Sequence, residues 1–90
     1  MDKIMIIIPL NLFKLEQEIM IIGQDGTKVF AQVELAHLPE VAVEACNVHN
    51  TDQIKLIGNG NYAEALANEI KEYAIQNYSN TNLNISIMEA

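Results

Sequence analysis

The first hydrophobic segment of the chain has no polar position. Residues 4–8 read Ile-Met-Ile-Ile-Ile, and Pro9 ends the run. A strand that is apolar on both alternating faces is typical of the interior of a sheet with cover on both sides. We therefore expect a central strand here.

Two further strands are predicted on either side of a turn. Residues 16–22 begin polar and become wholly apolar, and residues 28–35 form a second, alternating run. In the second run one face carries Val29, Ala31, Val33 and Leu35, and the other carries Lys28, Phe30, Gln32 and Glu34. The segment Gly23-Gln24-Asp25-Gly26 between the runs has the residues that tight turns favour. We expect a hairpin whose second strand lies at a sheet edge.

The segment after the hairpin has the signals of a helix. Pro39 and Glu40 suit a first helical turn, so we expect a helix over about residues 39–49. The stripe predicted to pack on the sheet consists of Val41, Ala45 and Val48, with Ala42 and Cys46 beside it.

A second helix is expected to end near Tyr78. Asn61 is its predicted N-cap, and Glu64, three residues later, is the acid of a capping box. Helical spacing relates Ala63, Leu66, Ala67, Ile70, Tyr73, Ala74 and Asn77. This stripe is expected to cover the sheet.

Two more strands complete the predicted sheet. Residues 54–57 form a short strand, and Leu83, Ile85 and Ile87 alternate with other positions near the end of the sequence. The element order is β-β-β-α-β-α-β in a single domain, residues 1–90. Right-handed crossovers and a central first strand favour an α/β fold with one five-stranded mixed sheet, in the order 3-2-1-4-5, and two helices on one face.

This order of elements resembles the core of the ribonuclease H-like fold, which also forms each half of actin-like ATPases. In the nucleases of this group, carboxylates near the middle of the first strand and near the end of the fourth hold divalent metal ions. Here the first strand offers only Ile and Met, and the fourth ends Ile57-Gly58-Asn59. Actin-like ATPases close a nucleotide between two domains, and this sequence predicts one. The resemblance therefore implies the fold without the activity, and we expect no enzyme, no metal and no cofactor.

Charge and cysteine content exclude several classes of partner. Twelve acidic residues against five lysines give a net charge of -7, and the sequence has no arginine. Without arginine, bidentate contacts to phosphate and guanine are lost, so we expect no nucleic-acid partner. Cys46 is the only cysteine, which fits a reducing compartment, and no apolar run is long enough for a membrane span. We therefore expect a cytoplasmic protein with no membrane partner.

The segment Gly58-Asn59-Gly60-Asn61 is a candidate ligand site. It lies between a strand and a helix N-terminus, where free main-chain N–H groups could hold an anion. Ala63 stands where a dinucleotide fingerprint would place a further glycine, and no lysine follows within the loop, so the segment is not a P-loop. The alternative is a plain turn with Asn61 as the helix cap.

Cys46 and His49 lie three residues apart on the predicted first helix. Two ligands do not make a zinc site, and His37 would have to join them. No acid at suitable spacing would orient a nucleophile. Cys46 is therefore expected to be a small buried side chain.

A sheet with both helices on one face leaves its other face bare. The first strand is apolar on both faces, and in the second strand Met20 and Ile22 alternate with further isoleucines. Leu10, Leu12 and Phe13 could fold over part of the bare face; otherwise another chain must cover it, most often in a symmetric homodimer. The predicted interface residues are Met5, Ile7, Met20, Ile22, Leu12 and Phe13.

Two functional hypotheses follow from these patterns. The first is a non-enzymatic protein-interaction or assembly module that forms a homodimer, or docks on another protein, through the helix-free face of its sheet. The second is a domain that binds a small ligand or a nucleotide phosphate with the loop at residues 58–61.

Overall fold

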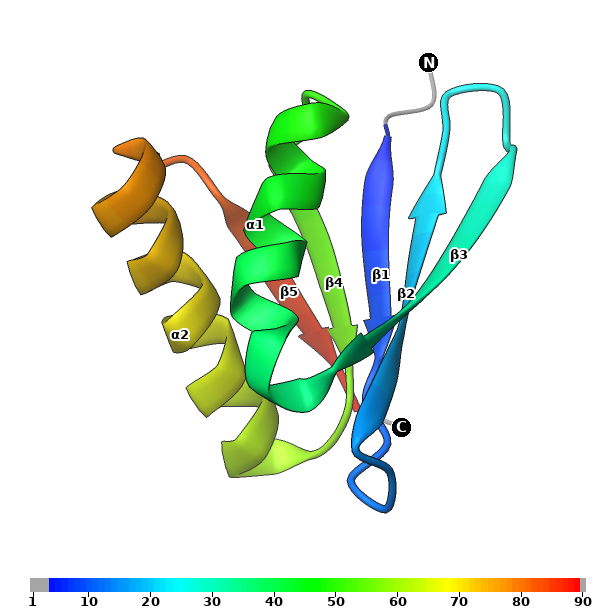
Figure 1. Cartoon of the computed structure of the whole chain (residues 1–90), viewed down its shortest axis with the longest axis vertical. Helices are drawn as coiled ribbons and strands as arrows, with labels where there is room; N and C mark the ends of the chain where they lie inside the picture. Colours follow the sequence, from blue (N-terminus) through cyan, green and yellow to red (C-terminus); the bar gives the residue numbers. More distant parts are fainter. Residues whose placement is uncertain (1–3, 90) are drawn as a thin grey trace.

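A mixed sheet of five strands forms the centre of the molecule (Figure 1). The computed structural model describes residues 4–89. The strands are β1 (Met5–Pro9), β2 (Glu16–Ile22), β3 (Lys28–Glu34), β4 (Gln53–Ile57) and β5 (Asn84–Met88). Their order is β3-β2-β1-β4-β5, and β2 alone runs antiparallel to its neighbours. The predicted sheet order is confirmed, with β3 and β5 at the edges.

Both helices cover the same face of the sheet (Figure 1). A single turn of 3-10 helix (Leu35–His37) leads from β3 into α1 (Leu38–Val48), and α2 (Gly60–Tyr78) connects β4 to β5. The two helices also pack against each other. This arrangement follows from two right-handed crossovers that step in the same direction across the sheet, as predicted.

The core lies between the helices and the covered face of the sheet. Alternation along the strands sends every second side chain into it, because successive side chains of a strand point to opposite faces. The buried apolar side chains are Ile6, Ile8, Ile19, Leu38, Ala42, Val43, Cys46, Ile54, Leu56, Ala63, Leu66, Ala67, Ile70 and Ala74. Small residues on both helices permit close approach to the isoleucine-rich strands.

The stripe of α1 that faces the core differs from the prediction. Leu38, Ala42 and Cys46 are buried at a spacing of four residues, whereas Val48 is exposed and Val41 is only partly buried. The helix begins at Leu38, whose large side chain enters the core and sets the rotation of the helix. The sequence of α1 has two adjacent apolar stripes, and the one that includes Leu38 packs into the core.

The start of α2 also differs from the prediction. The cap position is Asn59 rather than Asn61, and its side chain makes no capping hydrogen bond. Gly60 has φ +54, a left-handed conformation that favours glycine, and this turns the main chain into the helix early. Asn61 therefore lies inside the first turn, and the predicted capping box with Glu64 is wrong.

Candidate functional site

The face of the sheet opposite the helices carries a continuous group of apolar side chains. We call this side of the sheet the open face. Strand pairing places Met5 of β1 beside Ile22 of β2, and Ile7 beside Met20. All four side chains are partly exposed, while Ile6 and Ile8, which point to the other face, are buried. The four strand residues predicted for an interface therefore lie together on the open face.

Three further apolar side chains extend this group to both edges of the sheet. Phe30 of β3 lies beside Met20 and is 57% exposed. Ile57 of β4 lies beside Met88 of the edge strand β5, whose side chain is also exposed. The sequence pattern assigned Phe30 to a polar face, and only the pairing of the strands shows that it adjoins Met20. We call the seven residues the apolar band: Met5, Ile7, Met20, Ile22, Phe30, Ile57 and Met88.

Two opposite charges lie near the middle of the open face, on either side of β1, while Lys28, Glu16 and Glu34 lie on the same face at the ends of β2 and β3. Lys55 of β4 is beside Ile7, and Glu18 of β2 lies two residues before Met20 on the same face. Both side chains are partly buried. Neither forms an ion pair with another side chain among residues 4–89. The face therefore offers one free cation and one free anion at its centre.

The loop between β1 and β2 does not cover the open face. It extends beyond the carboxyl end of β1 (Figure 1), where Phe13 is 100% exposed and Leu12 is 58% exposed. Of the two alternatives, cover of the face by these side chains is not what the structure shows, because the buried side chain of Gln17 holds the loop elsewhere. The Gln17 amide accepts a hydrogen bond from Asn11 N–H at 2.7 Å and donates to the carbonyls of Asn11 and Lys14, both at 2.8 Å.

The predicted ligand loop lies beside this exposed loop. Leu12 and Phe13 line a hollow of about 290 Å³ together with Leu10, Asn11, Gly58, Asn59 and Tyr62. The Gly58 N–H donates to the Met88 carbonyl at 2.9 Å, so it is not free for a ligand. A Cβ atom at Gly58 would lie 3.0 Å from Leu10 Cδ1, which explains the glycine by packing. Anion binding by residues 58–61 stays a prediction, while their role as a strand-to-helix turn is evident.

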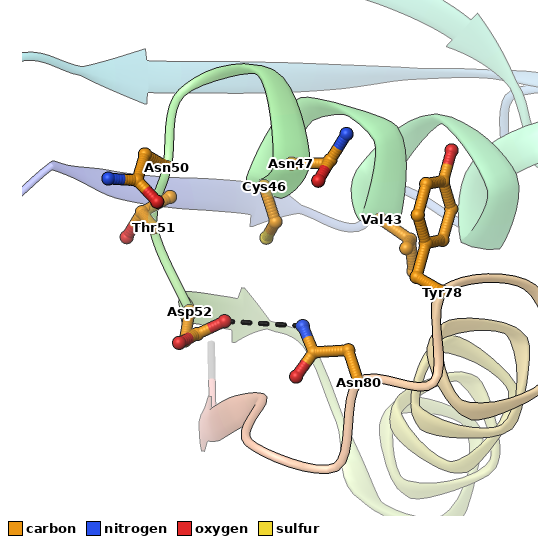
Figure 2. A pocket seen from close by; sticks show the side chains of 8 residues that line it. All are labelled: Val43, Cys46, Asn47, Asn50, Thr51, Asp52, Tyr78 and Asn80. Carbon is orange, nitrogen blue, oxygen red and sulfur yellow. Dashed lines mark hydrogen bonds between the residues drawn. The ribbon is translucent and has the colours of Figure 1, made fainter.

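A second hollow, of about 350 Å³, lies where α1 ends and β4 begins (Figure 2). Its polar lining includes Asp52 and Asn80, which are joined by a hydrogen bond of 3.2 Å from Asn80 Nδ2 to Asp52 Oδ1. The full lining is Val43, Cys46, Asn47, Asn50, Thr51, Asp52, Tyr78 and Asn80. One carboxylate near the carbonyl ends of the helices disfavours anions. Within residues 4–89, no three His, Cys, Asp or Glu side chains are grouped to hold a metal ion.

Cys46 faces this hollow but is buried among core side chains (Figure 2). Burial, together with the negative charge of Asp52, raises the pKa of its thiol to about 12. The thiol is therefore neutral at physiological pH and is a poor nucleophile. His37 and His49 flank the two ends of the 11-residue helix α1, about 16 Å apart, so they do not share a site with each other.

The raised pKa of Cys46 predicts a loss of stability in alkali. Above pH 9.0, the ordinary thiol value, the unfolded chain releases this proton while the folded chain retains it. The free energy of unfolding should therefore fall as pH rises from 9 towards 12, by up to about 1 kcal/mol per pH unit from this group. Urea titrations of the wild type and Cys46→Ala at several pH values measure the difference. Equal alkaline slopes for the two proteins would contradict the assignment.

Comparisons with protein families and with curated proteins identify no relative. No protein-family model matches this chain, and no curated protein is significantly similar to it in sequence. A membrane-spanning helix is not found among residues 4–89, because neither helix is long and apolar enough. Function must therefore be inferred from the surfaces of the molecule itself.

Proposed function

We propose that this protein is a non-enzymatic assembly module that forms a homodimer by packing the open faces of two copies against each other. The apolar band carries the proposal, because its seven side chains are distributed over all five strands and no helix among residues 4–89 covers them. An apolar sheet face of this extent is seldom left to water in a soluble monomer. Burial of such surface is the main favourable term in association.

The charges of the open face support a second copy as the occupant. Glu18 lies on the β2 side of β1 and Lys55 lies on the β4 side. A two-fold axis between the faces, parallel to β1, exchanges these sides, so Glu18 of each copy approaches Lys55 of the other. Each pair is expected to contribute about 0.2 to 1 kcal/mol, so the charges favour one orientation while the apolar band supplies affinity.

The polar chemistry of the chain supports a non-enzymatic role. The one thiol is held neutral by burial, and the Gln17 amide is fully engaged with the main chain of the neighbouring loop. Two acids of α1, Glu40 and Glu44, are exposed. An interface, rather than a catalytic site, accounts best for this distribution of side chains.

Ile7→Lys tests the proposal. Ile7 lies at the centre of the apolar band, so a lysine there places two like charges in the interface of a symmetric dimer. We expect the dissociation constant of the dimer to rise at least 100-fold, which corresponds to about 2.7 kcal/mol. The number of chains per particle in sedimentation should fall by half. Asn68→Lys makes the same charge change on the exposed side of α2 and should leave the assembly intact.

Two results would overturn the proposal. One is a wild-type particle whose mass is unchanged by Ile7→Lys while circular dichroism shows that the variant is folded. The other is a wild-type monomer that binds no hydrophobic dye. Its open face would then be neither packed against a second copy nor exposed as an apolar surface.

A further inference from the structure

The outer edge of β3 is a second surface that the open-face dimer does not use. β3 pairs with β2 along one side, and its other side has no neighbour within the part of the chain that the structure describes (Figure 1). Val29 and Phe30 point to opposite faces and are 53% and 57% exposed. The seven-residue strand has no proline and no bulge, and its charged side chains lie only at its ends. Such an edge is a template for pairing with another strand.

Main-chain geometry shows which residues face this free edge. In an antiparallel pair, hydrogen-bonded and non-hydrogen-bonded residue pairs alternate. Gly23 N–H donates to the Thr27 carbonyl, and Leu35 N–H donates to the Leu15 carbonyl, both at 2.8 Å. The same alternation directs the main-chain groups of Val29, Ala31 and Val33 towards β2. The residues whose N–H and C=O groups point outward are therefore Lys28, Phe30, Gln32 and Glu34.

We propose that two copies of this chain pair antiparallel along β3, about a two-fold axis at Ala31. This register pairs all seven residues of the strand and places each outward-facing residue opposite another outward-facing residue. Lys28 then lies opposite Glu34 of the second copy, at both ends of the ladder. Phe30 lies opposite Gln32, and Val29 lies opposite Val33. The two sheets become one sheet of ten strands, five from each copy.

The charge pattern selects this register from its neighbours. Opposite charges directly across an antiparallel pair stabilise it, and like charges destabilise it. A shift by two residues in either direction removes both Lys28–Glu34 pairs and leaves outward-facing main-chain groups unpaired. A parallel pairing in register would place Lys28 beside Lys28 and Glu34 beside Glu34. The centred antiparallel register alone satisfies both the charges and the hydrogen bonds.

Edge pairing places the open faces of the two copies on the same side of the enlarged sheet. Phe30 of each copy then flanks the two-fold axis, and the two apolar bands join there. The edge interface shares neither Ile7 nor Lys55 with the face-to-face interface. The two interfaces use different surfaces of the chain, so each would survive the loss of the other.

A symmetric cross-link tests the edge pairing. Ala31→Cys, made with Cys46→Ala and Ile7→Lys, places two thiols at a non-hydrogen-bonded pair, where Cα atoms lie about 4.5 Å apart. That separation suits a disulfide, so oxidised glutathione should link the chains at least about tenfold faster than in the control. Val29→Cys in the same background is the matched control on the same face of β3. Its two copies would lie about 13 Å apart along the strands, too far to be bridged.

Charge reversal tests the register. Lys28→Glu places like charges opposite each other and should slow cross-linking through Ala31→Cys, whereas Lys28→Glu with Glu34→Lys should restore it. Cross-linking no faster at residue 31 than at residue 29 would overturn the edge pairing. Failure of the double reversal to restore it would overturn the register. Because every variant carries Ile7→Lys, the result does not depend on open-face packing, and the two proposals fail separately.

Discussion

Leu56→Ala is expected to lower the free energy of unfolding by about 3 kcal/mol. Leu56 is fully buried in β4, beside Ile8 of β1 and Ile87 of β5, and both helices cover this face of the sheet. Truncation removes apolar burial and leaves a cavity that a rigid central strand cannot close. A domain of this size has a total stability of about 5 to 13 kcal/mol, so the loss is a large share of it. Urea denaturation followed by circular dichroism measures the change.

Ile57→Ala is the matched control for this prediction. Ile57 is the next residue of β4 and points to the open face, where it is partly exposed. In the Ile7→Lys background, where the open face is not packed against a second copy, its truncation should cost about 1 kcal/mol or less. Equal losses from Leu56→Ala and Ile57→Ala in that background would show that the two faces of the sheet are equally buried, contrary to the structure.

Substitution of Gln17 is expected to have the second largest effect on the folded chain, and Gln17→Leu is the first test. The Gln17 side chain is almost fully buried, and its amide satisfies the N–H and C=O of Asn11 and the C=O of Lys14. Leucine has a similar volume but leaves these main-chain groups without their partner, which should cost about 2 kcal/mol. The loop at residues 10–15 should also be cleaved faster by a protease under native conditions, because its anchor is lost.

Gln17→Glu separates the hydrogen bonds from the shape of the side chain. Glutamate retains an acceptor for Asn11 N–H but loses both donors and places its charge close to two carbonyl oxygens. We expect a loss at least as large as that of leucine at neutral pH, and partial recovery near pH 4 as the carboxyl gains a proton. A loop that stays protease-resistant in both variants would show that Gln17 is not its anchor.

Much of the fold could be predicted because local patterns and connection rules agree. Residues 4–8 are apolar on both faces, and this predicted β1 at the centre of the sheet, where it lies. The alternating run from Lys28 predicted an edge strand, and β3 is one. Right-handed crossovers then restrict the sheet to one order and the helices to one face. Successive side chains of a strand point to opposite faces, so the alternation of apolar and polar residues that this produces is visible in the sequence.

The candidate site was only partly predictable, for a physical reason. Met5, Ile7, Met20 and Ile22 could be assigned to the bare face because each lies on a strongly apolar strand. Their extension through Phe30, Ile57 and Met88 depends on which residues of distant strands pair. Leu12 and Phe13 were expected on the same face. The position of their exposed loop is set by the contacts that anchor it, not by the hydrophobicity of its side chains.

The sequence by itself determined the strands, the helices, the order of the sheet and the existence of a bare apolar face, since these depend on residue spacing and the handedness of connections. Only the tertiary structure decided which stripe of α1 is buried, where Gln17 holds its loop, and how Glu18 and Lys55 are placed about β1. These features arise from contacts between segments far apart in the chain. Such contacts depend on the packing of particular side chains, and no local periodicity encodes them.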